Sequence, residues 1–293
     1  MPKAGLVALV GRPNAGKSTL LNRLIGQKLA IVSAKPQSTR DRVVGIHTTD
    51  DTQFVFLDTP GLLNPRYALQ RAMRATALQA LADADVIVYL VDAAERHTES
   101  LAEAAGLPTP PRAPVLTVFN KADLLDDTTR AERIERVQGA LLISARTGEG
   151  VDALLDACRA HLPESPFLYP EDELSTQTMR YFTAELVRET ALEQLEEELP
   201  YSVACEVEEF REDRVPVYIR AVLYVERETQ KRMLIGAKGT RVRSIGQAAR
   251  AKIEALVGQQ VYLDLWVKVL HNWRKNAVAL RRFGYRLPEE SSS

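Results

Sequence analysis

Residues 11–18 have the types and spacing of a phosphate-binding loop. They read GRPNAGKS, a complete G-x-x-x-x-G-K-S pattern, and they lie between an apolar run at 6–10 and a helical pattern at 18–25. In such a loop successive backbone N–H groups point at a phosphate, and the positive end of the helix dipole adds to the attraction. Lys17 would reach the β- and γ-phosphates, and the Ser18 hydroxyl would bind Mg²⁺. The loop therefore predicts binding of a nucleoside triphosphate.

A second motif predicts which base is bound. Residues 120–123 read NKAD and follow an apolar run at 115–119. The Asp123 carboxylate would accept hydrogen bonds from guanine N1–H and from the exocyclic amine, a donor pair that adenine lacks. Ser144 and Ala145 follow the last core strand, where a backbone N–H would donate to guanine O6. Ligands of open α/β sheets bind at the carboxyl ends of the strands, so these residues predict GTP rather than ATP.

Two further positions complete the predicted magnesium site. Residues 58–61 read DTPG and end an apolar run at 54–57. Asp58 would hold Mg²⁺ through water, and the Gly61 N–H would contact the γ-phosphate. Thr39 lies in the loop between the first helix and the second strand, so its hydroxyl would close over Mg²⁺ in the GTP state. The predicted metal ligands are Ser18, Thr39 and Asp58, and the predicted catalytic residues are Lys17, Thr39 and Gly61.

Leu62 is informative about the mechanism. It stands where Ras-type GTPases carry the glutamine that orients the attacking water, and a leucine side chain cannot do this by hydrogen bonding. Hydrolysis would then depend on Lys17, Mg²⁺ and backbone donors, and slow intrinsic turnover is expected. The full set of predicted nucleotide-binding residues is Gly11, Arg12, Pro13, Asn14, Ala15, Gly16, Lys17, Ser18, Thr19, Asp58, Thr59, Pro60, Gly61, Leu62, Asn120, Lys121, Asp123, Ser144 and Ala145.

A glycine pair in the C-terminal half predicts a second site. Residues 236–239 read GAKG between two helical stretches, in the G-x-x-G pattern whose backbone approaches a nucleic-acid phosphate closely in KH domains. Ile235, Val242 and Ile245 would give the groove apolar walls for bases. The predicted RNA-binding residues are Arg232, Ile235, Gly236, Ala237, Lys238, Gly239, Arg241, Val242 and Arg243.

The distribution of charge supports this second site. The whole chain of 293 residues has a formal net charge of −1, but residues 229–286 hold 13 Lys and Arg against Glu254 and Asp264. Such a basic block on an acidic body predicts a nucleic-acid surface on one domain.

Only two cysteines, Cys158 and Cys205, are present, which argues against a disulfide framework or a cysteine metal site and fits the cytosol. No signal peptide and no membrane-spanning run are expected.

The elements that must position these residues follow from apolar periodicity. Strands are predicted at 6–10, 43–47, 54–57, 86–91, 115–119 and 141–144, and helices at 18–25, 67–81, 99–105, 130–138 and 151–161. This alternation predicts an α/β domain with a mostly parallel sheet and one antiparallel edge strand. Beyond a proline-rich stretch, a helix at 177–199, strands at 202–208, 217–225 and 260–268, and a basic tail at 272–286 predict an α+β domain.

Taken together, these motifs resemble the translation-factor-related GTPases, and more closely the Era family of bacterial GTPases. The resemblance rests on KPQSTR at 35–40, VGIHT at 44–48, DTPGL at 58–62, EELPYS at 197–202 and LDLWVKV at 263–269. Ala15 and Ser38 depart from the residues that are common in the family, but neither change removes a ligand. The resemblance implies a GTPase domain over 1–162, a linker over 163–176, and a type II KH RNA-binding domain with a basic C-terminal tail over 177–293.

The resemblance also implies partners and cofactors. These are GTP/GDP, Mg²⁺ and K⁺ near Asn14, and single-stranded RNA near the 3′ end of the 16S ribosomal RNA, with a role in assembly of the 30S subunit. A cytoplasmic monomer is expected, with peripheral contact of the basic segment 274–286 with the inner membrane through anionic lipid. Two other classes are the alternatives: an RNA-binding module with a vestigial nucleotide site, which intact Lys17 and Asp123 disfavour, and a tRNA-modification GTPase, which lacks a KH tail.

Overall fold

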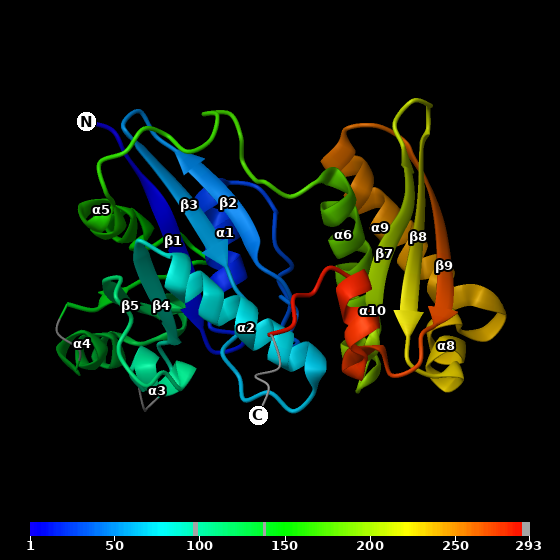
Figure 1. Ribbon diagram of the computed structural model, residues 1–293, viewed down its shortest axis with the longest axis horizontal. Coiled ribbons are helices and arrows are strands. Elements are labelled where there is room, and N and C mark those ends of the chain that lie inside the picture. The colour runs from blue at the N-terminus through cyan, green and yellow to red at the C-terminus, as the bar shows by residue number, and fades with distance from the viewer. Residues whose placement is uncertain (96–98, 137–138, 289–293) are drawn as a thin grey trace. The chain divides into compact units, whose positions relative to one another are not determined.

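A computed structural model describes residues 1–95, 99–136 and 139–288 of the chain. Two units are distinct in it (Figure 1). The first consists mainly of Met1–Arg66 and Gln70–Thr176, and the second of Gln177–Leu287 with the short stretch Tyr67–Leu69. No helix in the described part of the chain is both long enough and apolar enough to cross a membrane.

The first unit is built on a six-stranded sheet with the strand order β2-β3-β1-β4-β5-β6. All neighbouring strands are parallel except β2, which pairs antiparallel with β3 at one edge. Figure 1 shows helices α1 and α2 on opposite faces of this sheet. The strands are β1 Lys3–Gly11, β2 Val43–Thr48, β3 Thr52–Asp58, β4 Val86–Asp92, β5 Val115–Asn120 and β6 Leu141–Leu142; the helices are α1 Lys17–Ile25, α2 Ala68–Asp83, α3 Leu101–Ala105, α4 Asp127–Arg136 and α5 Val151–His161.

Burial on both faces explains the continuous apolar runs within the central strands of the first unit. Every residue of β3 is buried, and so are the first six residues of β4. Parallel strands covered on both faces carry continuous apolar runs rather than alternation. The polar residues of the predicted motifs directly follow these strands. Because the strands are parallel, their carboxyl ends, and with them the motifs, lie at the same edge of the sheet.

The second unit has a three-stranded sheet in the order β7-β8-β9, with β7 antiparallel and β9 parallel to β8. In its core, alternate residues of β8 from Val217 to Val225 pack against apolar residues of helices α6 and α9. Its elements are α6 Met179–Gln194, α7 Leu199–Ser202, β7 Ala204–Arg211, β8 Val217–Val225, α8 Glu228–Ile235, η2 Ala237–Gly239, α9 Thr240–Val257, β9 Val261–Val269, η3 Trp273–Lys275 and α10 Ala277–Arg282. The predicted fold class is confirmed for both units.

Several predicted element bounds were wrong. The helix expected at 177–199 ends at Gln194, because Leu195 leaves the helical conformation (φ −103°, ψ 151°) and Glu197 has a positive φ angle, and a separate short helix α7 follows. The strand expected at 141–144 keeps ladder pairs only at Leu141 and Leu142. α3 starts at Leu101, since Ser100 forms a capping box with Glu103. α4 starts at Asp127, and residues 137–138 of the helix predicted there lie outside the described residues.

The segment predicted as a linker packs on the first unit. The backbone N–H of Ile46 donates to the Leu174 carbonyl at 2.9 Å, and the Gln53 side chain bonds the backbone of Leu168 and Tyr169.

The last part of the chain is also folded: Trp273 is fully buried and donates from its indole to the Ser202 carbonyl at 2.8 Å. The basic tail is therefore part of the second unit's structure rather than an extended arm.

Candidate nucleotide and RNA sites

The phosphate-binding loop joins the end of β1 to the start of α1, as the motif requires. Its two glycines adopt positive φ angles, 155° at Gly11 and 98° at Gly16. A Cβ atom on Gly16 would lie 2.1 Å from the Asn120 amide nitrogen, so no larger residue fits there. Gly61 faces the loop from the end of β3, and its Cβ would lie 2.7 Å from the Pro13 nitrogen. Glycine is thus required where three segments meet.

The Lys17 side chain is held inside the phosphate loop, and among the residues that the structure describes no carboxylate forms an ion pair with it. The side chain is 5 % exposed, and Nζ donates to the carbonyls of Gly11 at 3.2 Å and Arg12 at 2.9 Å. Burial lowers the pKa of Lys17 to about 8, and the neighbouring Asp58 carboxylate opposes part of that shift. A buried ammonium with only carbonyl partners is strongly attracted to an entering phosphate.

Three predicted metal ligands come together from three elements. Ser18 Oγ lies 2.8 Å from Thr39 Oγ1 and donates to Asp58 Oδ2 at 2.7 Å. The second carboxylate oxygen, Asp58 Oδ1, is buried and has no hydrogen-bond partner among the described residues. Desolvation raises the pKa of Asp58 to about 6, although Lys17 and Ser18 stabilise the ionised form. An orphaned carboxylate oxygen beside two hydroxyls fits Mg²⁺, which prefers hard oxygen ligands.

Asn120 connects the phosphate loop to the segments predicted to bind the base. Its amide Nδ2 donates to the Ala15 carbonyl at 2.8 Å, and its Oδ1 accepts from the Ala145 N–H at 2.9 Å. The side chain is buried, so both bonds form away from water. One amide therefore sets the positions of two loops that are 130 residues apart in the sequence.

Asp123 is prepared as an anionic acceptor. Its Oδ1 accepts from Ser144 Oγ at 2.5 Å, and its Oδ2 lies 2.6 Å from Arg146 Nη2. The hydrogen bond from Ser144, with the Arg146 charge, holds the pKa of Asp123 below its usual value. A carboxylate retains free lone pairs beyond these two contacts, so it can still accept from guanine. Arg146 was missed in the sequence, where its neighbour Ala145 ends the recognisable motif.

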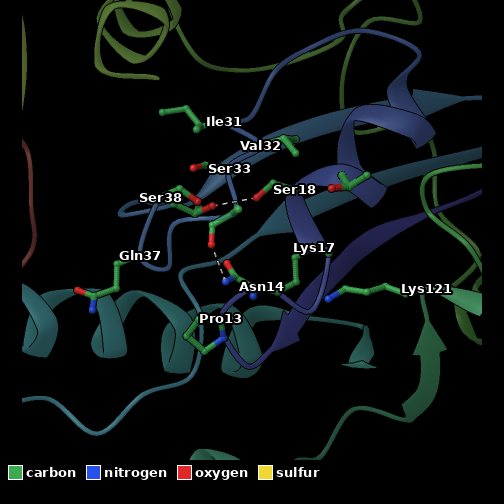
Figure 2. A pocket seen from close by; sticks show the side chains of 15 residues that line it. Pro13, Asn14, Lys17, Ser18, Ile31, Val32, Ser33, Gln37, Ser38 and Lys121 are labelled. Carbon is green, nitrogen blue, oxygen red and sulfur yellow. Dashed lines mark hydrogen bonds between the residues drawn. The ribbon is translucent and has the colours of Figure 1, made fainter. Parts of the chain in front are cut away.

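A pocket of about 350 Å³ lies over the phosphate loop (Figure 2). Nine of the predicted residues line it, namely Pro13, Asn14, Gly16, Lys17, Ser18, Thr19, Thr39, Gly61 and Lys121. Residues of the loop before β2 also line it and were not predicted: Ile31, Val32, Ser33, Ala34, Gln37 and Ser38. Asn14 Nδ2 donates to the Ala34 carbonyl at 3.0 Å and so joins that loop to the phosphate loop.

The side chains of three predicted nucleotide-site residues have partners within the protein that do not line this pocket. The Arg12 guanidinium is ion-paired with Glu99 at 2.7 Å and does not line the pocket. Thr59 is buried and donates from its hydroxyl to the Leu9 carbonyl at 2.9 Å. Lys121 lines the pocket while its Nζ lies 2.6 Å from Asp92 Oδ2.

Leu62 is a core residue. It is 5 % exposed and belongs to the same apolar cluster as Val10 and Leu57, while its N–H donates to the Gly11 carbonyl at 2.9 Å. We expect Leu62→Ala to change single-turnover phosphate release by less than about tenfold, or ~1.4 kcal/mol of barrier. The same variant should unfold more readily by about 2–5 kcal/mol, because it leaves a cavity.

Leu62→Met, which keeps the volume, is the matched control for that loss of stability. Thermal melting and phosphate release measured on both variants separate the two effects. A Leu62→Met enzyme with no hydrolysis would show that this side chain takes part in positioning the attacking water.

The second predicted site has the backbone that a phosphate clamp needs. Gly236 (φ 74°), Lys238 (φ 49°) and Gly239 (φ 77°) all have positive φ angles between α8 and α9. A Cβ on Gly236 would lie 2.9 Å from Arg241 Cβ, whereas one on Gly239 would meet nothing within 4 Å. The first glycine closes the turn, and the second leaves open space where a phosphodiester backbone can approach.

A groove of about 370 Å³ begins at this loop and runs between α9 and β9. It is lined by Gly239, Val242, Arg243, Gly246, Gln247, Arg250, Tyr262, Leu263 and Leu265. Three of the predicted RNA-binding residues, Gly239, Val242 and Arg243, are among them.

Two of the three predicted apolar walls of this groove need correction. Ile245 is fully buried in the core and is not a wall, because it lies on the side of α9 that faces the sheet. Ile235 does not line the groove, whose apolar walls come instead from Val242, Leu263 and Leu265. Arg241 does not line the groove; it is exposed, its Nη1 donates to the Met233 carbonyl at 2.8 Å, and its contact with RNA stays a prediction.

Comparison with known proteins covers both units. Residues 6–121 match the family described as 50S ribosome-binding GTPase, and residues 198–274 match the KH domain family. GTPase Era of Carboxydothermus hydrogenoformans is 42 % identical over 97 % of this chain and 98 % of its own length. GTPase Era of Geobacter metallireducens is 40 % identical over the same shares of the two chains.

Two solved structures are similar over nearly the whole chain. A crystal structure of a single-residue variant of Aquifex aeolicus Era bound to GDP·AlF4⁻ has a TM-score of 0.91 and 37 % identity, covering 97 % of this chain and 100 % of its own. A structure of Era with MgGDPNP and nucleotides 1506–1542 of 16S ribosomal RNA has a TM-score of 0.91 and 36 % identity, covering 98 % and 100 %. With this identity over both units and an intact phosphate loop, the chain belongs to the Era family of GTPases, which hydrolyse GTP and carry a C-terminal KH domain.

Proposed function

We propose that this protein is a GTP-driven switch that binds single-stranded RNA near the 3′ end of 16S ribosomal RNA and acts in assembly of the 30S subunit. The observation that carries the proposal is the presence in one chain of two built sites: the Ser18–Thr39–Asp58 oxygen cluster and the glycine-loop groove between α9 and β9. The Era relative that was crystallised with MgGDPNP and nucleotides 1506–1542 supports this pairing of ligands.

In the nucleotide site, each of this chain's groups has a distinct task. Lys17 and the loop N–H groups bind the β- and γ-phosphates and stabilise the charge that develops during transfer. Asp58, Ser18 and Thr39 would hold Mg²⁺, which supplies charge neutralisation at the phosphates when bound. The Gly61 N–H contacts the γ-phosphate. Asp123 selects guanine and Ser144 holds it in place, while the Ala145 N–H, predicted to donate to guanine O6, is bonded instead to Asn120 Oδ1.

Slow intrinsic turnover follows from what surrounds the γ-phosphate. Leu62 is buried in the core, and none of the pocket-lining residues that the structure describes is a carboxylate or histidine that could act as a base. Hydrolysis therefore depends on electrostatic stabilisation alone. K⁺ near the phosphates would bind through Asn14 Oδ1, because Asn14 Nδ2 already donates to Ala34.

RNA binding is expected to fail when the glycine loop carries negative charge. Replacing Ala237 and Lys238 by aspartate places two carboxylates at exposed positions where a phosphate must approach, so affinity should fall at least about a hundredfold. GTP binding should not change, because the nucleotide pocket is built from residues 13–121. Filter binding of a 16S ribosomal RNA 3′ fragment and titration with a fluorescent guanine nucleotide measure the two affinities.

A matched control carries the same change of charge elsewhere on the second unit. Val278→Asp with Arg281→Asp on α10 also adds two carboxylates and removes one cation, so it changes the net charge by the same amount, and it should keep most of the RNA affinity. Wild-type affinity should fall with salt with a slope of roughly −2 to −3, from about −0.7 per neutralised phosphate over four nucleotides. Equal affinity of the loop variant and the control, or a flat salt response, would remove the RNA assignment.

A further inference from the structure

On the face of the second unit's sheet opposite α6 and α9, residues at the end of α10 cover Tyr224, whereas the part of the face that holds Tyr218 and Tyr262 is left open. Residues of β8 alternate, so that Val217, Ile219 and Ala221 enter the core while Tyr218 and Arg220 lie on the opposite face. The edge strand β9 continues this open face with Tyr262, Asp264 and Trp266, because Tyr218 is paired with Tyr262, Arg220 with Asp264, and Val222 with Trp266.

An aromatic stack stands on this face. The rings of Tyr218 and Tyr262 lie 5.9 Å apart with an interplanar angle of 13°. Three guanidinium groups, those of Arg211 at 5.5 Å, Arg214 at 5.4 Å and Arg220 at 5.8 Å, lie over the Tyr218 ring. Tyr218 is thus partly buried, whereas Tyr262 at the sheet edge is 57 % exposed. The stack ends in a ring that can accept another planar group.

Trp266 provides a second exposed ring on the same strand. It is 53 % exposed, and its indole N–H donates to Asp264 Oδ1 at 2.8 Å. Asp264 Oδ2 also accepts from the Tyr218 hydroxyl at 3.0 Å and from Arg220 Nε at 3.1 Å. These bonds fix the indole and neutralise the carboxylate, so that the surface presents oriented aromatic faces without an unpaired negative charge at Asp264.

Tyr262 belongs both to this face and to the glycine-loop groove. It lines the groove together with Gly239, Val242 and Arg250. Tyr262 and Trp266 are four residues apart on a strand, which separates them by about 13 Å. About two nucleotides of RNA with unstacked bases span this distance. A strand that leaves the groove at Tyr262 can therefore place its next bases at Trp266.

We propose that Tyr262 and Trp266 form a stacking platform on β9 for two bases of single-stranded RNA that continues from the glycine-loop groove across the edge of the sheet. This inference rests on the proposed RNA-binding function and extends its site. Single-stranded nucleic acid is held by combining cationic grooves with aromatic rings, and Arg243 and Arg250 in the groove supply the cations next to the rings. A protein partner would instead favour a continuous apolar patch, whereas here Asp264 and Lys268 alternate with the rings.

Tryptophan fluorescence tests the platform directly. The chain has two tryptophans, of which Trp273 is fully buried and Trp266 is exposed. Stacking of a base on Trp266 should quench the emission when the 1506–1542 fragment of 16S ribosomal RNA is added. Trp266→Phe keeps a ring for stacking and should retain most of the RNA affinity while losing the quench. Binding of the fragment by the wild-type protein with no quench would overturn the proposal.

A length series then locates the platform on the RNA. The same fragment is trimmed one nucleotide at a time from each end, and affinity is measured for the wild type, for Tyr262→Ala with Trp266→Ala, and for Tyr262→Phe with Trp266→Phe. One or two trimming steps should cost the wild type and the Phe pair about tenfold, and should cost the Ala pair little, because its rings are already absent.

The same series separates failure of the platform from failure of RNA binding. If the Ala pair binds every length as well as the wild type, or loses the same factor at every length, the platform is overturned while the groove stands. The aspartate variant of Ala237 and Lys238 should lose affinity at all lengths. If that variant binds normally, the groove assignment fails instead. Thermal melting of each variant shows that the second unit is still folded.

Discussion

Lys17→Ala is expected to lower GTP hydrolysis at least about a thousandfold. The Lys17 ammonium is the one side-chain cation that the phosphate loop itself buries, and its removal leaves the γ-phosphate charge to backbone N–H groups and Mg²⁺. Loss of a single preorganised donor in an enclosed site typically costs about 10²–10³ in rate, and here a full charge is lost as well. Single-turnover release of phosphate measures the effect without interference from product release.

The matched control is Lys28→Ala, which removes an exposed lysine just beyond α1. It should hydrolyse GTP at the wild-type rate. Because Lys17 bonds the carbonyls of Gly11 and Arg12, the variant must also be shown to remain folded by thermal melting. A folded Lys17→Ala protein that turns over within tenfold of the wild type would show that another group carries the γ-phosphate charge.

Asp123→Asn is expected to weaken GTP binding about 30- to 1,000-fold. The variant amide presents a donor where guanine N1–H and the exocyclic amine also donate, and the charged bidentate contact, worth roughly 2–4 kcal/mol, is lost. The variant also leaves Arg146 without its carboxylate partner. Titration with a fluorescent guanine nucleotide measures the change.

A compensating ligand makes the test of Asp123 specific. Xanthine carries a carbonyl where guanine carries the amine, so Asp123→Asn should gain affinity for xanthosine triphosphate as it loses affinity for GTP. Unchanged GTP affinity, or equal binding of ATP and GTP by the wild type, would contradict the assignment of the base site. An Arg146→Ala variant, in which Asp123 is intact, should retain the preference for GTP over xanthosine triphosphate.

The sequence predicted best those features that are determined locally. The phosphate loop needs glycines at fixed spacing with a strand before it and a helix after it, and all of these are adjacent in the chain. The core strands could be found because burial on both faces requires continuous apolar runs. For the same reason Asp58 and Asn120 were placed correctly at strand ends, where Asp58 meets Ser18 and Asn120 meets Ala15.

Features that depend on tertiary contacts were not predicted. Nothing in the local pattern of 31–38 indicates that this loop would line the nucleotide pocket, because its position depends on bonds such as Asn14 to Ala34. Ile245 was predicted as a groove wall because it is apolar and lies near the glycine loop in the sequence, but it belongs to the core face of α9. The charge count predicted a nucleic-acid surface but could not indicate which cations are paired within the fold, as Arg274 is with Glu226 at 2.6 Å and Arg282 with Glu206 at 2.7 Å.

The double hydrogen bond of Asn120 limits how this site could change by mutation. The residue must donate to Ala15 and accept from Ala145 at once, and Gly16 leaves no room beside it. Aspartate would lose the donor, and glutamine would not fit the space. A mutation that changed the base preference by moving the backbone at Ala145 would therefore also move the phosphate loop at Ala15. Such a change would slow hydrolysis. New base specificity is open to such a protein through single changes at Asp123, which leave this amide in place.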